Sequence, residues 1–161
     1  MLIEKEIEAK IVQEFKKLQP LKGMEVAGAR QETSSGIVKG EKEVSSGGVV
    51  AVSVGLRAHD AFSLSPVTVS ASVVVSTRAE MDETGLMHEQ AMEAVADLLS
   101  RWHRYGDQMQ TALETERFHA GELRMDGGTG KQFDQTRSAW VESVTFSIRG
   151  AERFNNNSTE G

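Results

Sequence analysis

Two stretches, separated by ten residues, decide the fold of this chain: VTVSASVVV at 67–75 and LMHEQAMEAVADLLSRW at 86–102. In the first stretch, valine and alanine alternate with threonine and serine, which is the two-residue period of a half-buried strand. Valine is stiff and β-branched and suits a pleated surface. The first stretch therefore predicts a central strand, and Pro66 stands at its entrance, where a missing N–H is tolerated.

The second stretch changes to the period of a helix. Its apolar residues recur at spacings of three and four, as on the buried side of an amphipathic helix: Met87, Ala91, Val95, Leu98 and Trp102. Just before it, Asp82, Glu83 and Thr84 offer oxygens for the unpaired N–H groups of the first turn. Gly106 is suited to the left-handed residue that ends many helices. A strand that feeds a capped helix predicts a core of one sheet covered by helices.

The remaining elements follow from the same two periods. We predict helices over 2–18 and 86–102 and strands over 49–57, 67–75, 118–125 and 140–148. The strands 49–57 and 67–75 have no helix between them in the sequence, so we expect them to be antiparallel neighbours in the sheet. The sequence therefore predicts an α+β fold of order α-β-β-α-β-β, with a mostly antiparallel four-stranded sheet and helices packed on one face.

The length allows one domain with a real core. Of the 161 residues, we assign 1–150 to a single domain and 151–161 to a disordered C-terminal tail, since the tail has no apolar period. Residues 23–48 hold six glycines and two serine pairs. We expect a long Gly/Ser-rich loop there, and loops of that length are often functional.

Composition narrows the class of protein. With 39% hydrophobic and 26% charged residues the chain resembles an ordinary globular protein, and it has no cysteine for disulfides, thiolate metal sites or nucleophilic catalysis. The net charge of −6 argues against a surface that grips nucleic-acid backbone. There is neither a basic leader with an apolar run nor a span of about 18 apolar residues. We expect a soluble intracellular product with no membrane contact.

Motifs that would carry chemistry are incomplete. DGGTGKQ at 126–132 lacks both the first glycine and the final Ser or Thr of a phosphate-binding loop. The histidines are not spaced as helix-borne metal ligands: His59, His88, His103 and His119. No serine lies in Gly-x-Ser-x-Gly. We therefore predict no catalytic, cofactor or metal site and no enzyme activity.

The chain resembles the tail-terminator, or tail-completion, proteins of long-tailed bacteriophages. The resemblance covers about residues 2–150 in element order. Three stretches carry the most specific part of the resemblance. The first is the strand 66–75, which passes through an acidic turn into the helix 87–102. The others are ELRMDGG at 122–128 and Ser138-Ala139-Trp140 before the last strand. The Gly/Ser-rich segment 28–48 and the Asn-rich end depart from the simplest members of that family.

The resemblance implies a virion protein that forms a homo-oligomeric ring, typically of six copies. Such a ring caps the tail tube, presents a surface to the head–tail connector protein, and lets phage DNA pass through its lumen without specific binding. Its expected place is the head–tail interface of the virion, and the host cytoplasm during assembly. A ring needs a heterologous interface between two different patches.

We expect ring or tail-tube contacts from two segments, 28–48 and 126–135, together with the arginine that precedes the second one. The candidate residues are Ser34, Ser35, Ile37, Lys39, Glu41, Arg124, Asp126, Lys131 and Phe133. Three other functions stay open: a neck or head–tail joining subunit, a small α+β ligand-binding or enzymatic domain, and, more weakly, a nucleic-acid-binding module. A deep apolar pocket with convergent polar groups would favour the ligand-binding domain.

Overall fold

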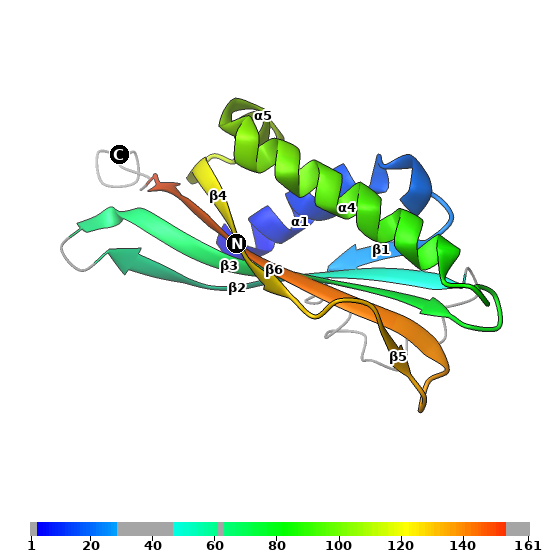
Figure 1. Ribbon diagram of the computed structural model, residues 1–161. Helices are drawn as coiled ribbons and strands as arrows, with labels where there is room; N and C mark the ends of the chain where they lie inside the picture. Colours follow the sequence, from blue (N-terminus) through cyan, green and yellow to red (C-terminus); the bar gives the residue numbers. More distant parts are fainter. Residues whose placement is uncertain (1–2, 29–46, 61–62, 154–161) are drawn as a thin grey trace.

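The computed structural model describes residues 3–28, 47–60 and 63–153 as one curved sheet with all its helices on one side (Figure 1). The strands are β1 (Glu25–Gly28), β2 (Gly48–Asp60), β3 (Ser63–Arg78), β4 (Phe118–Gly128), β5 (Gln132–Asp134) and β6 (Ala139–Glu152). The helices are α1 (Ile3–Lys16), η1 (Gln19–Leu21), α4 (Leu86–Arg104) and α5 (Gly106–Leu113).

The sheet is mixed, and its strand order is β1-β2-β3-β6-β4, with β5 paired to the start of β6. β2 and β3 form an antiparallel hairpin, as predicted, and β6 is antiparallel to β3, β4 and β5. β1 is parallel to β2. The predicted α+β class with helices on one face is confirmed.

The prediction of four strands was wrong, because two short strands lie in segments that we had assigned to loops. β1 falls inside 23–48, and β5 falls inside 126–135. Strands of three or four residues are too short to show a period. Each is stabilised by a neighbour far along the chain, β2 for β1 and β6 for β5.

Several element boundaries also differ from the predictions. β2 runs on to Asp60, beyond the predicted end at residue 57, and β3 already begins at Ser63, before the predicted start at residue 67. β6 runs four residues beyond the predicted end at Ile148. α5 (Gly106–Leu113) lies in a segment for which no helix was predicted. Gly106 begins that helix; it does not close α4, whose C-cap is Tyr105.

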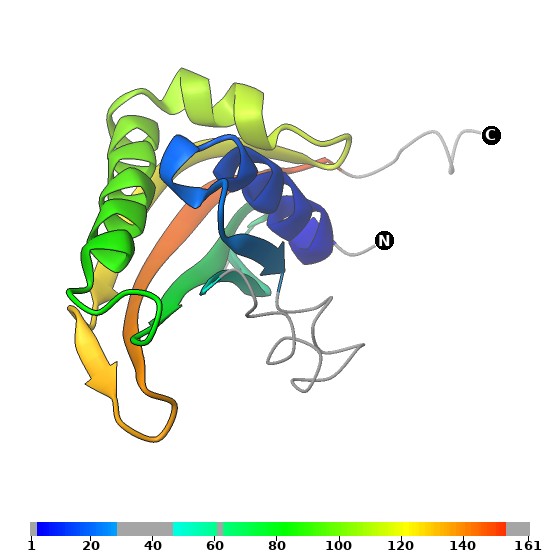
Figure 2. The ribbon, with the colours of Figure 1, turned by 90° about the vertical axis from the view of Figure 1, so that its right-hand side faces the viewer.

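The core lies between the sheet and the helical layer. α1 contributes Ile3, Ile7, Ile11 and Phe15 to it, all fully buried. The central strands contribute the predicted valines, and α4 contributes its apolar stripe, including Trp102. Figure 2 shows the sheet curving around α1, α4 and α5, so that one side of the sheet carries the helices.

Candidate interaction surface

The side of the sheet away from the helices carries mainly small uncharged side chains in its middle. In β3 and β6, valine, phenylalanine and isoleucine point toward the helices, and every second residue points the other way. We call this second set the open face. Over the three central strands its uncharged members are Ala51, Ser53, Thr68, Ser70, Ser72, Val74, Ser76, Val141, Ser143, Thr145 and Ser147, and it has an arginine at each end, Arg78 on β3 and Arg149 opposite Thr68 on β6.

Two of the sequence-predicted contact residues border the open face on β4. Arg124 Nε lies 3.3 Å from Asp126 Oδ1. The other carboxylate oxygen of Asp126 accepts a hydrogen bond from the Ser147 hydroxyl on β6. The structure therefore brings Arg124 and Asp126 together as a charged border to the uncharged middle of the open face.

The other two described candidates, Lys131 and Phe133, lie on the helical side. The Lys131 ammonium is 2.7 Å from Glu89 Oε1 of α4 and 4.9 Å from the centre of the Trp140 ring. Phe133 packs edge-on against the same indole, with ring centres 5.0 Å apart. These contacts fasten the β5–β6 hairpin to α4, and they separate Lys131 and Phe133 from Arg124 and Asp126.

The remaining candidates come from the Gly/Ser-rich segment. Ser34, Ser35, Ile37, Lys39 and Glu41 lie outside the described residues, and their predicted contact role stays a prediction.

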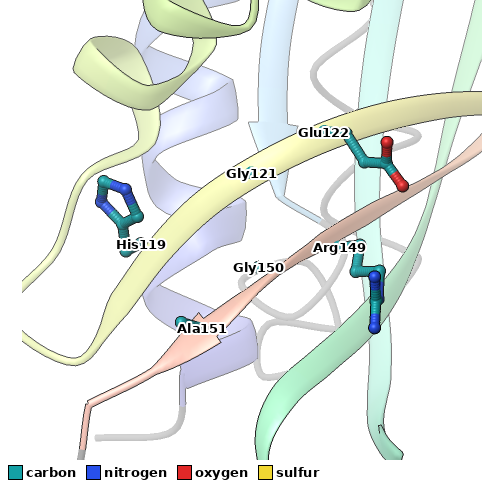
Figure 3. Close-up of a pocket in the computed structure, with 6 residues that line it drawn as sticks. All are labelled: His119, Gly121, Glu122, Arg149, Gly150 and Ala151. Carbon is teal, nitrogen blue, oxygen red and sulfur yellow. The ribbon is translucent and has the colours of Figure 1, made fainter.

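The open face has a hollow near the start of β4 and the end of β6, with a volume of about 420 Å³ (Figure 3). It forms where a bulge at Gly121 shifts the register between β4 and β6. Its lining consists of His119, Gly121, Glu122, Arg149, Gly150 and Ala151. The side chains are of mixed charge around two glycines, so the hollow is not the deep apolar pocket that a metabolite site would require.

A small ionic cluster lies beside this hollow. Glu114 Oε1 is 3.0 Å from His119 Nδ1, and its other oxygen pairs with the Arg153 guanidinium. Partial burial alone would raise the pKa of Glu114, but the hydrogen bonds and charges of His119 and Arg153 outweigh it, so the pKa is lowered. The cluster joins the segment after α5 to the start of β4 and the end of β6.

The acidic turn before α4 is a structural anchor. Asp82 accepts hydrogen bonds from the N–H groups of Met87 and His88, both at 3.0 Å, and from the Thr77 hydroxyl at 2.8 Å. Burial alone would raise its pKa, but these three donors and the nearby His88 outweigh it, so the pKa of Asp82 lies below its ordinary value. The expected capping role is confirmed for Asp82.

A buried histidine follows this anchor. His88 is fully buried, and its Nε2 lies 3.0 Å from Glu142 Oε1 on β6. Its Nδ1 has no hydrogen-bond partner among the described residues. No sequence pattern indicates this pair, because the two residues are 54 positions apart.

Near each of the two edges of the sheet, a side chain from a helix bonds a backbone group of a strand. Glu8 of α1 accepts the N–H of Val54 at 3.2 Å, just beyond the point where β1 stops pairing with β2. His103 of α4 donates to the carbonyl oxygen of Leu123 on β4 at 2.7 Å. Because such bonds occupy groups that could pair with another strand, they limit strand addition at these two points.

Metal binding and membrane insertion find no support in the part of the chain that the structure describes. No three His, Asp or Glu side chains there are grouped to hold a metal ion. None of the helices in the described ranges is both long and apolar enough to cross a bilayer.

Compared with known proteins, the sequence matches no family model, and no curated protein matches it either.

Proposed function

We propose that this protein is a structural virion subunit, resembling phage tail terminators, that assembles into a ring. In this proposal the ring, of six copies by resemblance, caps the tail tube and joins it to the head connector. The subunit has no catalytic role. The open face is its main contact surface, toward a neighbouring subunit or the tube.

The observation that carries the proposal is the absence of charge from the middle of the open face, between Arg78 and Arg149. The whole chain is 26% charged, so eleven surface positions would be expected to carry about three charges, as soluble surfaces generally do. The charges that β3 and β6 place on the open face, Arg78 and Arg149, stand at its two ends, and the eleven other positions carry none. Depletion of charge with a charged border, here Arg124 and Asp126, is the pattern of a protein–protein interface.

Two further features are consistent with the proposal. The net charge of −6 disfavours tight binding of phosphates, as is needed if DNA slides through a ring. The N–H of Val54 and the carbonyl oxygen of Leu123 are already hydrogen-bonded to helix side chains. A partner is therefore more readily bound through a face of the sheet than by strand addition at those two points.

Light scattering coupled to size exclusion, with negative-stain images, tests the proposal on the full chain alone and with tail-tube protein. We expect rings in at least one of the two samples. Ser70→Lys puts a charge in the middle of the open face and should abolish ring formation, whereas Ser100→Lys, on an exposed turn of α4, should not. A monomer in both samples would overturn the proposal, and so would rings that tolerate Ser70→Lys.

A neck or head–tail joining subunit is the nearest alternative, and the same surface would serve it. Pull-down with purified connector protein and purified tube protein separates the two roles. Binding to the tube supports the terminator, and binding to the connector alone supports the joining subunit.

The hollow near Gly121, whose 420 Å³ falls within the range of small-molecule sites, is the observation behind a ligand-binding or enzymatic domain. A thermal-shift screen with nucleotides, sugars and amino acids tests it. A stabilising ligand whose effect is lost in Arg149→Ala but kept in Arg104→Ala would support this alternative.

A further inference from the structure

A second surface feature lies in the helical layer, away from the open face. A groove of about 750 Å³ runs between η1 and the exposed side of α4. Figure 2 shows η1 beside α4. The groove follows α4 from Leu86 to Arg101, about 22 Å at the rise of an α-helix. That length matches roughly four turns of a second helix.

The groove is apolar along part of its length. Leu18 and Pro20 lie on the η1 wall, and Leu86 and Ala94 lie on the α4 wall. Leu86 is 55% exposed, which is unusual for a leucine beside a hollow. An apolar strip of this kind gains free energy when a partner covers it.

The α4 wall also carries an acidic ladder. Glu89, Glu93 and Asp97 stand four residues apart, so that each is one helical turn from the next. Like charges at this spacing repel each other and destabilise a helix. Glu89 is neutralised by Lys131, but Glu93 and Asp97 are exposed and have no ion pair with any other described residue.

Only one basic residue, Arg101, is among the described residues that line the groove. A partner with positive charge would therefore relieve the repulsion between Glu93 and Asp97, and an apolar stripe on the same partner would cover Leu86 and Ala94. The two requirements together describe a basic amphipathic helix, which binds by laying its apolar side into a groove.

The described helices of this chain cannot serve as that partner. The apolar side of α1 is buried on the sheet, and the apolar sides of α4 and α5 are buried with it. A second copy would have to unfold its own core to offer one of them. The occupant is therefore expected to belong to another protein.

We propose that the groove between η1 and α4 is a docking site for a basic amphipathic helix of a partner protein. Leu86 and Ala94 cover the apolar side of that helix, while Glu93 and Asp97 pair with its lysines or arginines. The site is separate from the open face, so ring formation and helix docking are independent properties.

The probe is an 18-residue synthetic peptide with leucines on one helical side and lysines on the other. One control peptide has the same composition in scrambled order, and a second has glutamate in place of lysine. Binding to the full chain is measured by fluorescence anisotropy at two salt concentrations. We expect saturable binding of the amphipathic basic peptide alone, weakened by salt.

Variants of the full chain test whether the peptide binds in the groove between η1 and α4. Glu93→Lys with Asp97→Lys should weaken it at least tenfold, whereas Asp107→Lys with Glu116→Lys, which makes the same charge change at exposed sites outside the groove, should weaken it less than threefold. Leu86→Gln should weaken it several-fold, and Met125→Gln, at an exposed apolar residue of β4, should not. Circular dichroism verifies that each variant is folded.

Three results would overturn the proposal. One is equal binding of the scrambled peptide, and another is equal loss in both double variants, which would indicate attraction by net charge alone. The third is no peptide binding, together with a change in oligomeric state in Glu93→Lys with Asp97→Lys, which would make a second copy the occupant. Ring assembly of Ser70→Lys is measured separately, so failure of the ring does not count against the groove.

Discussion

His103 Nδ1 on α4 lies 2.7 Å from the carbonyl oxygen of Leu123 on β4, and this hydrogen bond ties the last turn of the longest helix to the strand at the border of the sheet. Because a carbonyl oxygen only accepts, the bond fixes Nδ1 as the protonated nitrogen when the ring is neutral. The contact joins two elements whose positions depend on each other.

Removing that bond should destabilise the protein modestly. His103→Leu is expected to cost about 1 kcal/mol of unfolding free energy, the usual net value of one hydrogen bond. His103→Asn, whose amide nitrogen reaches the position of Nδ1, should recover at least half of the loss. Urea unfolding followed by circular dichroism measures both, and equal stability of the two variants would show that the bond contributes nothing.

Asp82→Asn should destabilise the protein by about 1.5–3 kcal/mol at pH 7, because three donors lose a charged acceptor. The folded pKa of Asp82 lies below the unfolded one. Its stabilisation is therefore complete above the unfolded value of about 3.9 and is lost as pH falls through the folded pKa.

Unfolding measured from pH 7 to pH 2 should accordingly show a smaller acid-induced loss in Asp82→Asn than in the wild type. Asp107→Asn, at an exposed carboxylate of α5, serves as the control and should follow the wild type. A variant curve parallel to the wild type would contradict the anchoring role of Asp82.

Arg153→Ala should raise the pKa of Glu114 toward its ordinary value, because the guanidinium that pairs with the carboxylate is lost. Titration of the Glu114 carboxyl carbon by NMR measures this directly. Lys17→Ala, which removes the partner of Glu14 on the surface of α1, should leave the titration of Glu114 unchanged. An unchanged pKa in Arg153→Ala would assign the lowering to His119 alone.

Gly150→Ala should destabilise the protein by about 1–3 kcal/mol or more, since overpacking forces the neighbours apart. An added methyl group would overlap the backbone oxygen of His119 and stand 2.8 Å from the Phe118 ring. Gly23→Ala is the matched control, because nothing lies within 4 Å of its added carbon. Thermal unfolding compares the two, and a Gly150→Ala protein as stable as the control would show that β4 can shift freely.

The sequence by itself determined which parts of the chain are long strands and long helices, and which side of each is buried. The valines of 67–75 and the stripe from Met87 to Trp102 repeat over several turns or pleats, so periodicity alone identifies them. The capping by Asp82 was equally readable, because a cap and its helix are neighbours in sequence.

Only the tertiary structure decided what depends on distant partners. β1 and β5 are too short for a period and exist because β2 and β6 offer them backbone groups. The pair of His88 and Glu142 and the bond from His103 to Leu123 join residues far apart in the chain. The open face and the groove beside α4 likewise require several strands or helices placed side by side, because a surface is defined by packing and not by the order of residues along one strand.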